Sequence, residues 1–174
     1  LHAVYLLKDP LVVNVDGTAA QLSQTTFAFD IDADGVEDQI SRLMPGSGFL
    51  ALDQNNDGII NDGAELFGPA TGSGFSELSA HDRDQNGWID ENDDIFDRLR
   101  IWTQNPDGES RLFALGEKSI GAIFLGHAAT AFSLTDPQNR LLGQIRETGV
   151  YLYETGRAGT IQELDLNTAA AFES

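Results

Sequence analysis

The sequence predicts a single α+β domain in which strands outnumber a few short helices. Three observations support this class. Short apolar and β-branched runs recur along the chain, as they do in buried strands. Two segments between residues 75 and 99 space their apolar residues as a helix does. Acidic stretches that end in glycine interrupt these segments at three places, so short elements alternate with structured loops.

The first two-thirds of the chain is predicted to combine strands with two helices. Residues 75–81 are expected to form a helix that leads into the third acidic stretch. Residues 91–99 are expected to form the helix that leaves it, with Ile95, Phe96 and Leu99 on one face. Short apolar runs predict the strands, at residues 11–15, 27–31, 49–52 and 100–103.

Beyond residue 110 the acidic spacing disappears and β-type segments dominate. We therefore predict one domain over residues 1–174, with a loop-rich part at 10–110 and a β-rich part at 111–174. The strand candidates of the second part are residues 119–125, 131–134, 141–146, 150–154 and 160–166.

Charge and composition exclude several classes of function. The chain has 174 residues, of which 41% are hydrophobic, so it can bury a core. Its net charge is −18, and 17 of its 28 Asp and Glu residues fall between Asp30 and Asp97. This charge argues against nucleic acid and anionic membranes as partners, and no apolar run approaches the ~20 residues that span a bilayer. The absence of cysteine excludes disulfides, thiol catalysis and cysteine zinc sites.

The acidic residues follow the spacing of EF-hand-like calcium loops. Such loops carry oxygen ligands at positions 1, 3 and 5, a glycine at position 6 and a backbone carbonyl ligand at position 7. Divalent cations would also relieve the repulsion among the crowded carboxylates. We predict two to three calcium ions, bound by loops that open at residues 30–35, 53–58 and 82–87.

The loops differ in how they close at position 12. The third loop is complete, and its ligands are predicted to be Asp82, Asp84, Asn86, the Trp88 carbonyl and Asp93. The second loop has Ala64 at position 12, which cannot bind a metal, so we expect Glu65 to close a loop lengthened by one residue. Its other ligands are predicted to be Asp53, Asn55, Asp57 and the Ile59 carbonyl.

The first loop lacks a strong closing ligand, because Ser41 stands at position 12. It must borrow an acidic group from Glu37 or from a neighbouring loop. A fourth stretch, at residues 103–108, begins with threonine, and we interpret it as a degraded loop. The predicted ligands of the first loop are Asp30, Asp32, Asp34, the Val36 carbonyl and Asp38.

At this point the chain resembles a known family over roughly residues 9 to 125. It is similar to the calcium-binding self-processing module of repeat-in-toxin (RTX) proteins and to related modules of large secreted proteins and adhesins. The resemblance implies an extracellular or cell-surface location on a Gram-negative bacterium. The segments that carry it are "DPLVVNVDG", "FDIDADG", "GFLALDQNNDGIINDGAELFG", "HDRDQNGWIDENDDIFDRLRIW" and "LGEKSIGAIFL".

The resemblance also implies a reaction, in which calcium-driven folding is followed by cleavage of an Asp-Pro bond. Here that bond would be Asp9–Pro10, at the N-terminal edge of the matching region. The aspartate carboxyl attacks its own main-chain carbonyl to form a cyclic anhydride, and the proline nitrogen leaves. Water or a lysine amine then opens the anhydride, and a lysine would link two chains.

Three functions follow as expectations. The leading one is a calcium-binding structural or interaction module whose folding is stabilised by the metal. The second is a self-processing module that cleaves Asp9–Pro10. The third is an adhesin domain that binds a peptide, a sugar or another segment of its parent protein.

Overall fold

The computed structural model describes residues 9–17 and 19–166, and it is essentially all-β. Strands account for 49% of the chain and helices for 10%. The predicted α+β class is therefore wrong. The strands form an eight-stranded antiparallel sheet and a separate two-stranded sheet.

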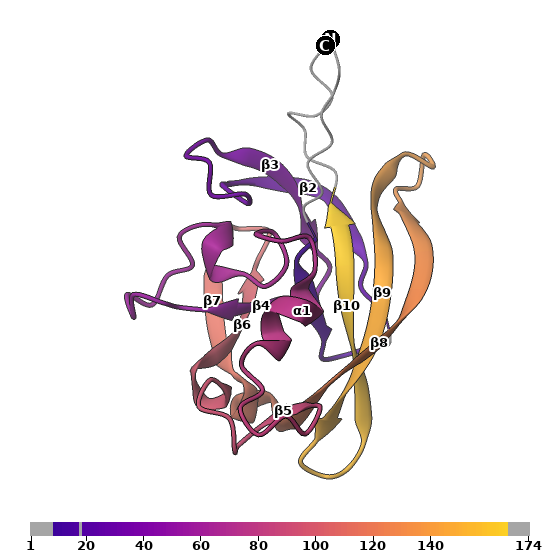
Figure 1. Ribbon diagram of the computed structural model, residues 1–174. Coiled ribbons are helices and arrows are strands. Elements are labelled where there is room, and N and C mark those ends of the chain that lie inside the picture. The colour runs from indigo at the N-terminus through magenta and orange to yellow at the C-terminus, as the bar shows by residue number, and fades with distance from the viewer. Residues whose placement is uncertain (1–8, 18, 167–174) are drawn as a thin grey trace.

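The large sheet mixes strands from the beginning and the end of the chain (Figure 1). Its order is β5-β8-β9-β10-β1-β4-β6-β7, so the last strand, β10, lies between β9 and the first strand, β1. The smaller sheet is the hairpin of β2 (Leu22–Phe29) and β3 (Asp38–Leu43). The large sheet consists of β1 (Leu11–Asn14), β4 (Ser47–Leu52), β5 (Trp88–Asp90), β6 (Leu99–Gln104), β7 (Ser110–Ala114), β8 (Ile120–Thr135), β9 (Leu141–Tyr153) and β10 (Ala158–Leu166).

Both faces of the central strands are buried, which explains why β1 is apolar at consecutive positions. Leu11 and Val13 belong to one core with Phe75 of helix α1 (Gly74–Ser79). Val12 belongs to a second core, to which the hairpin of β2 and β3 contributes Phe27 and other residues. Figure 1 shows α1 in front of the sheet, close to β10 and β4.

The predicted helix over residues 91–99 is wrong. Only the 3₁₀ turn η2 (Phe96–Arg98) forms there, after the short strand β5. Ile95 and Leu99 are nevertheless buried. The apolar spacing therefore correctly indicated which residues are buried, but not the type of secondary structure. The Asp90 and Asp93 carboxylates accept hydrogen bonds from backbone N–H groups, and these bonds stabilise turns in place of a helix.

Two further predictions concerned strand boundaries. Residues 119–125 and 131–134 belong to one long strand, β8, and residues 141–146 and 150–154 belong to β9. Register shifts at several points in this pair allow the strands to continue through glycine and polar residues.

The acidic loops are not EF-hands, which corrects that part of the predicted fold. The first loop joins β2 to β3, and the second follows β4 and ends in the 3₁₀ turn η1 (Gly63–Glu65). The third follows α1 and runs into β5. No loop in the described part of the chain lies between two α-helices, because strand pairing anchors most of their ends. The remaining 3₁₀ turn, η3 (Leu115–Lys118), lies outside the loops.

Candidate functional site

The three acidic loops share one backbone conformation. In each of them the fourth and the sixth residues have positive φ angles. Glycine adopts this region readily, whereas other residues do so at a cost in free energy. The φ angles are 56° at Ala33, 56° at Asn56 and 55° at Gln85, followed by 88° at Gly35, 78° at Gly58 and 83° at Gly87.

The same hydrogen bonds recur in all three loops. The position-1 carboxylate accepts the N–H groups of positions 5 and 6, as Asp82 does from Asn86 at 3.3 Å and Gly87 at 2.9 Å. The position-5 oxygen accepts the N–H of position 7, as Asn86 does from Trp88 at 2.9 Å. Asp30 and Asp53 open their loops in the same way. The loops therefore turn their side-chain oxygens inward.

Acidic side chains converge in two of the loops. Within the described residues, Asp30, Asp32 and Asp34 form one group, and Asp82, Asp84 and Asp93 form another. In each group one oxygen atom per residue lies within 4.8 Å of the others. The pKa of Asp84 is raised by loss of solvent, by its hydrogen bond with Asp82 and by the charge of Asp93. Such crowded oxygen donors suit a hard cation such as calcium.

The second and third loops close in equivalent ways. Asp93 accepts the N–H groups of Arg83 at 2.8 Å and Asp90 at 3.1 Å, which are loop positions 2 and 9. Glu65 accepts the N–H groups at the same two positions of the second loop. The donors are Gln54, at 3.0 Å, and Asn61, at 2.7 Å. Glu65 thus closes the second loop, although Asn55 at position 3 leaves this loop with fewer acidic groups.

The first loop closes against the second. The Gly63 N–H donates to the Asp30 carbonyl at 2.8 Å, and a Cβ at Gly63 would lie 1.6 Å from the Ile31 carbonyl oxygen. Glu37 is exposed and does not belong to the convergent group.

The fourth stretch is a hairpin turn between β6 and β7, closed by the Gly108 N–H and the Asn105 carbonyl at 2.9 Å. Pro106 stands where the other loops have a positive φ angle, which proline cannot adopt.

The Asp9 side chain is fully buried beside Arg146 of β9. Its Oδ2 accepts a hydrogen bond from Arg146 Nη1 at 2.9 Å, and its Oδ1 has no hydrogen-bond partner among the described residues. Burial raises the pKa of Asp9 to about 6, against the lowering effect of the Arg146 charge, and Asp165 raises it further. One carboxylate oxygen is thus anchored and the other is not.

The Pro10–Leu11 peptide, which follows the Asp9–Pro10 bond, is held on two sides. The Leu164 N–H of β10 donates to the Pro10 carbonyl at 3.1 Å, and the Leu11 N–H donates to the Phe67 carbonyl at 2.8 Å. Gly68, with φ of 122°, lies against the Asp9 carbonyl, since a Cβ there would be 1.7 Å from that oxygen. The two glycines of "GAELFG" therefore contact the first loop and Asp9 respectively.

Sequence reasoning missed the acidic residues that surround Asp9. Glu163 of β10 is 2% exposed and accepts the Gly74 N–H at 2.6 Å. Burial raises its pKa to about 7, and a hydrogen bond with Glu147 and the charges of Asp9 and Glu147 add to this rise. Burial also raises the pKa of Asp165, and Arg146 opposes that shift. The sequence did contain a signal for this cluster. Ile161, Glu163 and Asp165 alternate along a predicted strand, so their side chains lie on the same face and place two acidic groups beside an apolar one.

A β-bulge sets the position of Arg146. Glu163 pairs with Glu147 and Leu164 pairs with Ile145, so Arg146 is the extra residue of β9. Arg146 and Glu147 are adjacent in sequence, yet both belong to this cluster, because Arg146 donates a hydrogen bond to Asp9 and the charge of Glu147 acts on Glu163. His127 Nδ1 lies 2.8 Å from Glu147 Oε1, and its ring stacks on Phe75 with centroids 4.4 Å apart.

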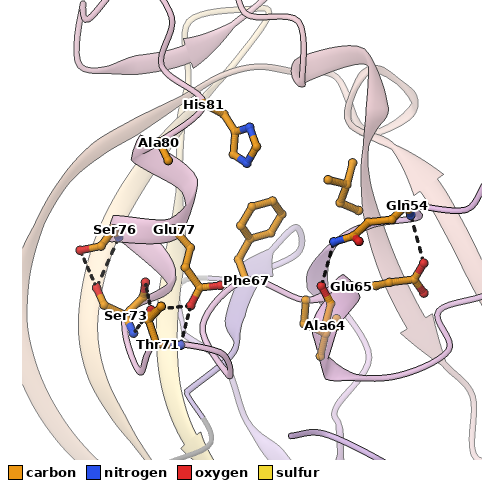
Figure 2. A pocket seen from close by; sticks show the side chains of 12 residues that line it. Gln54, Ala64, Glu65, Phe67, Thr71, Ser73, Ser76, Glu77, Ala80 and His81 are labelled. Carbon is orange, nitrogen blue, oxygen red and sulfur yellow. Dashed lines mark hydrogen bonds between the residues drawn. The ribbon is translucent and has the colours of Figure 1, made fainter. Parts of the chain in front are cut away.

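A cavity of about 630 Å³ lies between the second loop and α1. Figure 2 shows Gln54, Ala64 and Glu65 on one side and Glu77 on the other, with Phe67 and His81 between them. Glu77 accepts a hydrogen bond from the Thr71 hydroxyl at 2.6 Å.

Trp102 is buried against Phe27, Phe29 and Phe49 and offers no open aromatic platform.

Two comparisons with known proteins bear on the family. A family model described as SPM domain matches residues 11–167. The iron-regulated protein FrpA of Neisseria meningitidis serogroup C is 33% identical over 139 aligned residues, which cover 71% of this chain. The alignment spans only 12% of that relative's length. Separately, none of the helices in the described part of the chain has the length and apolar character needed to cross a membrane.

Proposed function

This chain belongs to the SPM domain family, and on that basis we propose that it is a calcium-stabilised module of a larger secreted or surface RTX-like bacterial protein. The observation that carries the proposal is the convergence of three acidic side chains in the first loop and three in the third. The alignment with only 12% of FrpA supports its role as one module of a long chain. Millimolar calcium outside the cell would fill sites too weak for the cytosol.

The donor chemistry of the loops fits calcium. The side chains of Asp82, Asp84, Asn86 and Asp93, with the Trp88 carbonyl, would hold one ion, and the loops that begin at Asp30 and Asp53 would hold others. Bound calcium would supply positive charge to carboxylates that otherwise repel one another. Glu65 and Asp93 are also held by backbone N–H groups, so metal binding and loop closure would reinforce each other.

Thermal unfolding tests this proposal. We expect the melting temperature to fall by at least about 10 °C when EDTA replaces millimolar calcium, because two or three sites would each contribute about 2 to 3 kcal/mol. Magnesium at the same concentration is the control, since it demands a smaller octahedral shell. An unchanged melting temperature in EDTA would contradict calcium binding.

A second function, cleavage of the Asp9–Pro10 bond by the chain itself, is favoured by the environment of Asp9. The attacking group must be a carboxylate oxygen with an available lone pair close to its own carbonyl. Asp9 Oδ2 is anchored by Arg146, while Oδ1 lacks a hydrogen-bond partner among the described residues. Exclusion of water strengthens the electrostatic effect of Arg146 on the reacting group.

The reaction itself needs no cofactor chemistry. Asp9 Oδ1 forms a bond with the Asp9 main-chain carbonyl carbon, and the bond from that carbon to the Pro10 nitrogen breaks. The nitrogen retains the electron pair and takes up a proton. The product is a cyclic anhydride, which water opens to a C-terminal aspartate or a lysine amine opens to an isopeptide bond.

The chain contains a second Asp-Pro bond, Asp136–Pro137, which is a natural comparison. Asp136 Oδ1 accepts the N–H groups of Gln138 and Arg140, both at 2.9 Å, and Oδ2 accepts from Arg140 Nε at 2.7 Å. The pKa of Asp136 is lowered, mainly because its carboxylate accepts a hydrogen bond from the backbone N–H of Arg140. Both oxygens are therefore engaged, and we expect no cleavage at this bond.

The segment from Glu65 to Gly68 offers a route by which the second loop acts on Asp9. Glu65 closes that loop, and two residues later the Phe67 carbonyl accepts the Leu11 N–H. Gly68 then contacts the Asp9 carbonyl directly. We expect loop closure to order this segment and so to fix the Asp9 carbonyl against the attacking oxygen.

Mass spectrometry of the chain with its N-terminal residues intact tests cleavage. In millimolar calcium we expect loss of residues 1–9, and Asp9→Ala should abolish it. The matched control is Asp136→Ala, which should cleave as the unaltered chain does. Cleavage at Asp136–Pro137, or an unchanged mass over a day, would contradict the proposal.

A further inference from the structure

Glu163 and Glu147 form a pair of neighbouring carboxyl groups, of which Glu163 is buried. The two residues lie directly opposite each other in the ladder of β10 and β9, and Glu163 is 2% exposed. Burial raises the pKa of Glu163 to about 7, and the charges of Asp9 and Glu147 add to this rise. Glu163 therefore keeps its proton at pH values at which an ordinary glutamate has lost it.

This pair lies beside the Asp9–Pro10 peptide. Glu163 is the ladder partner of Leu11, one residue beyond Pro10, and the next residue, Leu164, donates its N–H to the Pro10 carbonyl. The Glu163 carboxyl accepts the Gly74 N–H, and the Gly74 backbone lies close to the Leu11 side chain. The bulge then brings Arg146, the partner of Asp9, next to Glu147.

Breakage of the Asp9–Pro10 bond needs an acid, because the prolyl nitrogen must gain a proton as it leaves. We propose that Glu163 is the acid that protonates the Pro10 nitrogen. The inference rests on the self-cleavage proposed above and extends it to a residue from the far end of the chain.

The proton and electrons balance over the full cycle. As Asp9 Oδ1 binds the carbonyl carbon, the electron pair of the broken bond stays on the Pro10 nitrogen, and the Glu163 proton moves to it. Glu163 is then ionised, with Arg146 as the nearby positive charge. When water opens the anhydride, its oxygen bonds to the carbonyl carbon and the bond from that carbon to Asp9 Oδ1 breaks. The electron pair of the broken bond stays on Oδ1, and one proton of the water returns to Glu163.

The charged and titratable groups around Glu163 set the expected pH dependence. Glu147 and Arg146 face it from β9, Asp9 from the segment before β1, and Asp165 lies two residues along β10. His127 of β8 contacts Glu147, and α1 contributes the Gly74 N–H.

Cleavage requires Asp9 ionised and Glu163 protonated. Since the pKa values of these groups are raised to about 6 and about 7, the rate should peak between them and fall above pH 7.

The test is the single-turnover rate of cleavage in saturating calcium from pH 5 to pH 9, followed by mass. Glu163→Gln keeps an acceptor for the Gly74 N–H but cannot give a proton. We expect it to lower the rate by about 10²-fold or more and to abolish the decline above pH 7. Asp165→Asn is the matched control, because it removes a neighbouring acid of the same strand and should keep that decline.

A second variant covers the case in which Glu163→Gln does not fold, as judged by its calcium-dependent melting temperature. Glu147→Gln removes the charge that helps to raise the pKa of Glu163, so the decline in rate should move to lower pH. An unmoved decline would overturn the inference. If the unaltered chain cleaves and Glu163→Gln cleaves equally fast, only the role of Glu163 is wrong. If the unaltered chain does not cleave at any pH, self-cleavage and the role of Glu163 are both overturned.

Discussion

The molecule gathers acidic residues in two regions that handle negative charge differently. In the acidic loops the carboxylates come from within about a dozen residues of one another, are half-buried or exposed except for Glu65 and Asp93, and accept hydrogen bonds from their own backbone. In the buried cluster they come from residues as distant as Asp9 and Asp165 and share one guanidinium, Arg146. The loops suit a metal ion, whereas the cluster retains protons. Equal composition therefore leads to different chemistry when burial differs.

The largest expected effect comes from Arg146, the cation that pairs with Asp9 in the buried cluster. Arg146→Leu would leave Asp9 buried without its partner, and we expect a loss of about 3 to 5 kcal/mol in the free energy of unfolding at pH 7.5. The loss should shrink at pH 5, where Asp9 is protonated. Urea denaturation measures both values.

Arg83→Leu provides the control for that measurement. It breaks an ion pair with Asp94 in which both side chains are largely exposed, so it should cost less than about 1 kcal/mol. Similar losses for the two arginine variants would mean that burial does not distinguish the two regions.

The next largest effect concerns the loops. Asp82→Ala removes the first ligand of the most complete loop, and we expect it to reduce the stabilisation by calcium by about 2 to 3 kcal/mol. Asp107→Ala, in the degraded fourth stretch, should leave that stabilisation unchanged. Calcium titrations followed by urea denaturation compare them, and equal calcium responses would remove the distinction between complete and degraded loops.

The free energy of unfolding, measured over a range of pH, tests whether the buried cluster retains protons and so differs from the loops. The folded pKa of Glu163, about 7, lies above its ordinary value of 4.5, and that of Asp9, about 6, lies above 3.8. Between these limits the folded protein binds more protons than the unfolded chain, so the free energy of unfolding falls as pH rises. This part of the stability is fully present below about pH 4 and lost by about pH 7.

The variant Glu163→Gln measures how much of this decrease in the free energy of unfolding with pH is due to Glu163. We expect the loss of stability between pH 5 and pH 8 to be smaller in the variant, by on the order of 2 kcal/mol. Saturating calcium in both samples keeps the loops occupied. Identical losses in the variant and the unaltered chain would contradict a protonated Glu163.

The smallest expected effect tests the loop backbone alone. Gly87→Ala places a side chain at a φ of 83° with no steric contact within 4 Å, so the cost should be the backbone strain of about 1 kcal/mol. Gly116→Ala, which also has open space and no positive φ, should be nearly neutral. Thermal melts separate them, and a neutral Gly87→Ala would remove the conformational reason for this glycine.

The local features were largely predictable. The openings of the three loops and the closure of the second loop by Glu65 follow from spacing, and the structure has this geometry. Calcium binding itself stays a prediction. The helix over residues 91–99 and the α+β class were wrong because apolar spacing reports burial on either kind of element, and strand pairing decided which element formed.

The sequence by itself determined the acidic loops, since each is encoded within about a dozen residues by Asp, Asn and a glycine at fixed spacing. The sequence distinguished Asp9–Pro10 from the identical dipeptide Asp136–Pro137 only by its place next to the matching segments. Only the tertiary structure showed that the two aspartates have different surroundings, because antiparallel pairing of β1 with β10 and a bulge in β9 bring Glu163 and Arg146 to Asp9. Contacts between residues more than 130 positions apart depend on which strands pair and in which register, and the spacing of residues within one strand does not identify its partner strand.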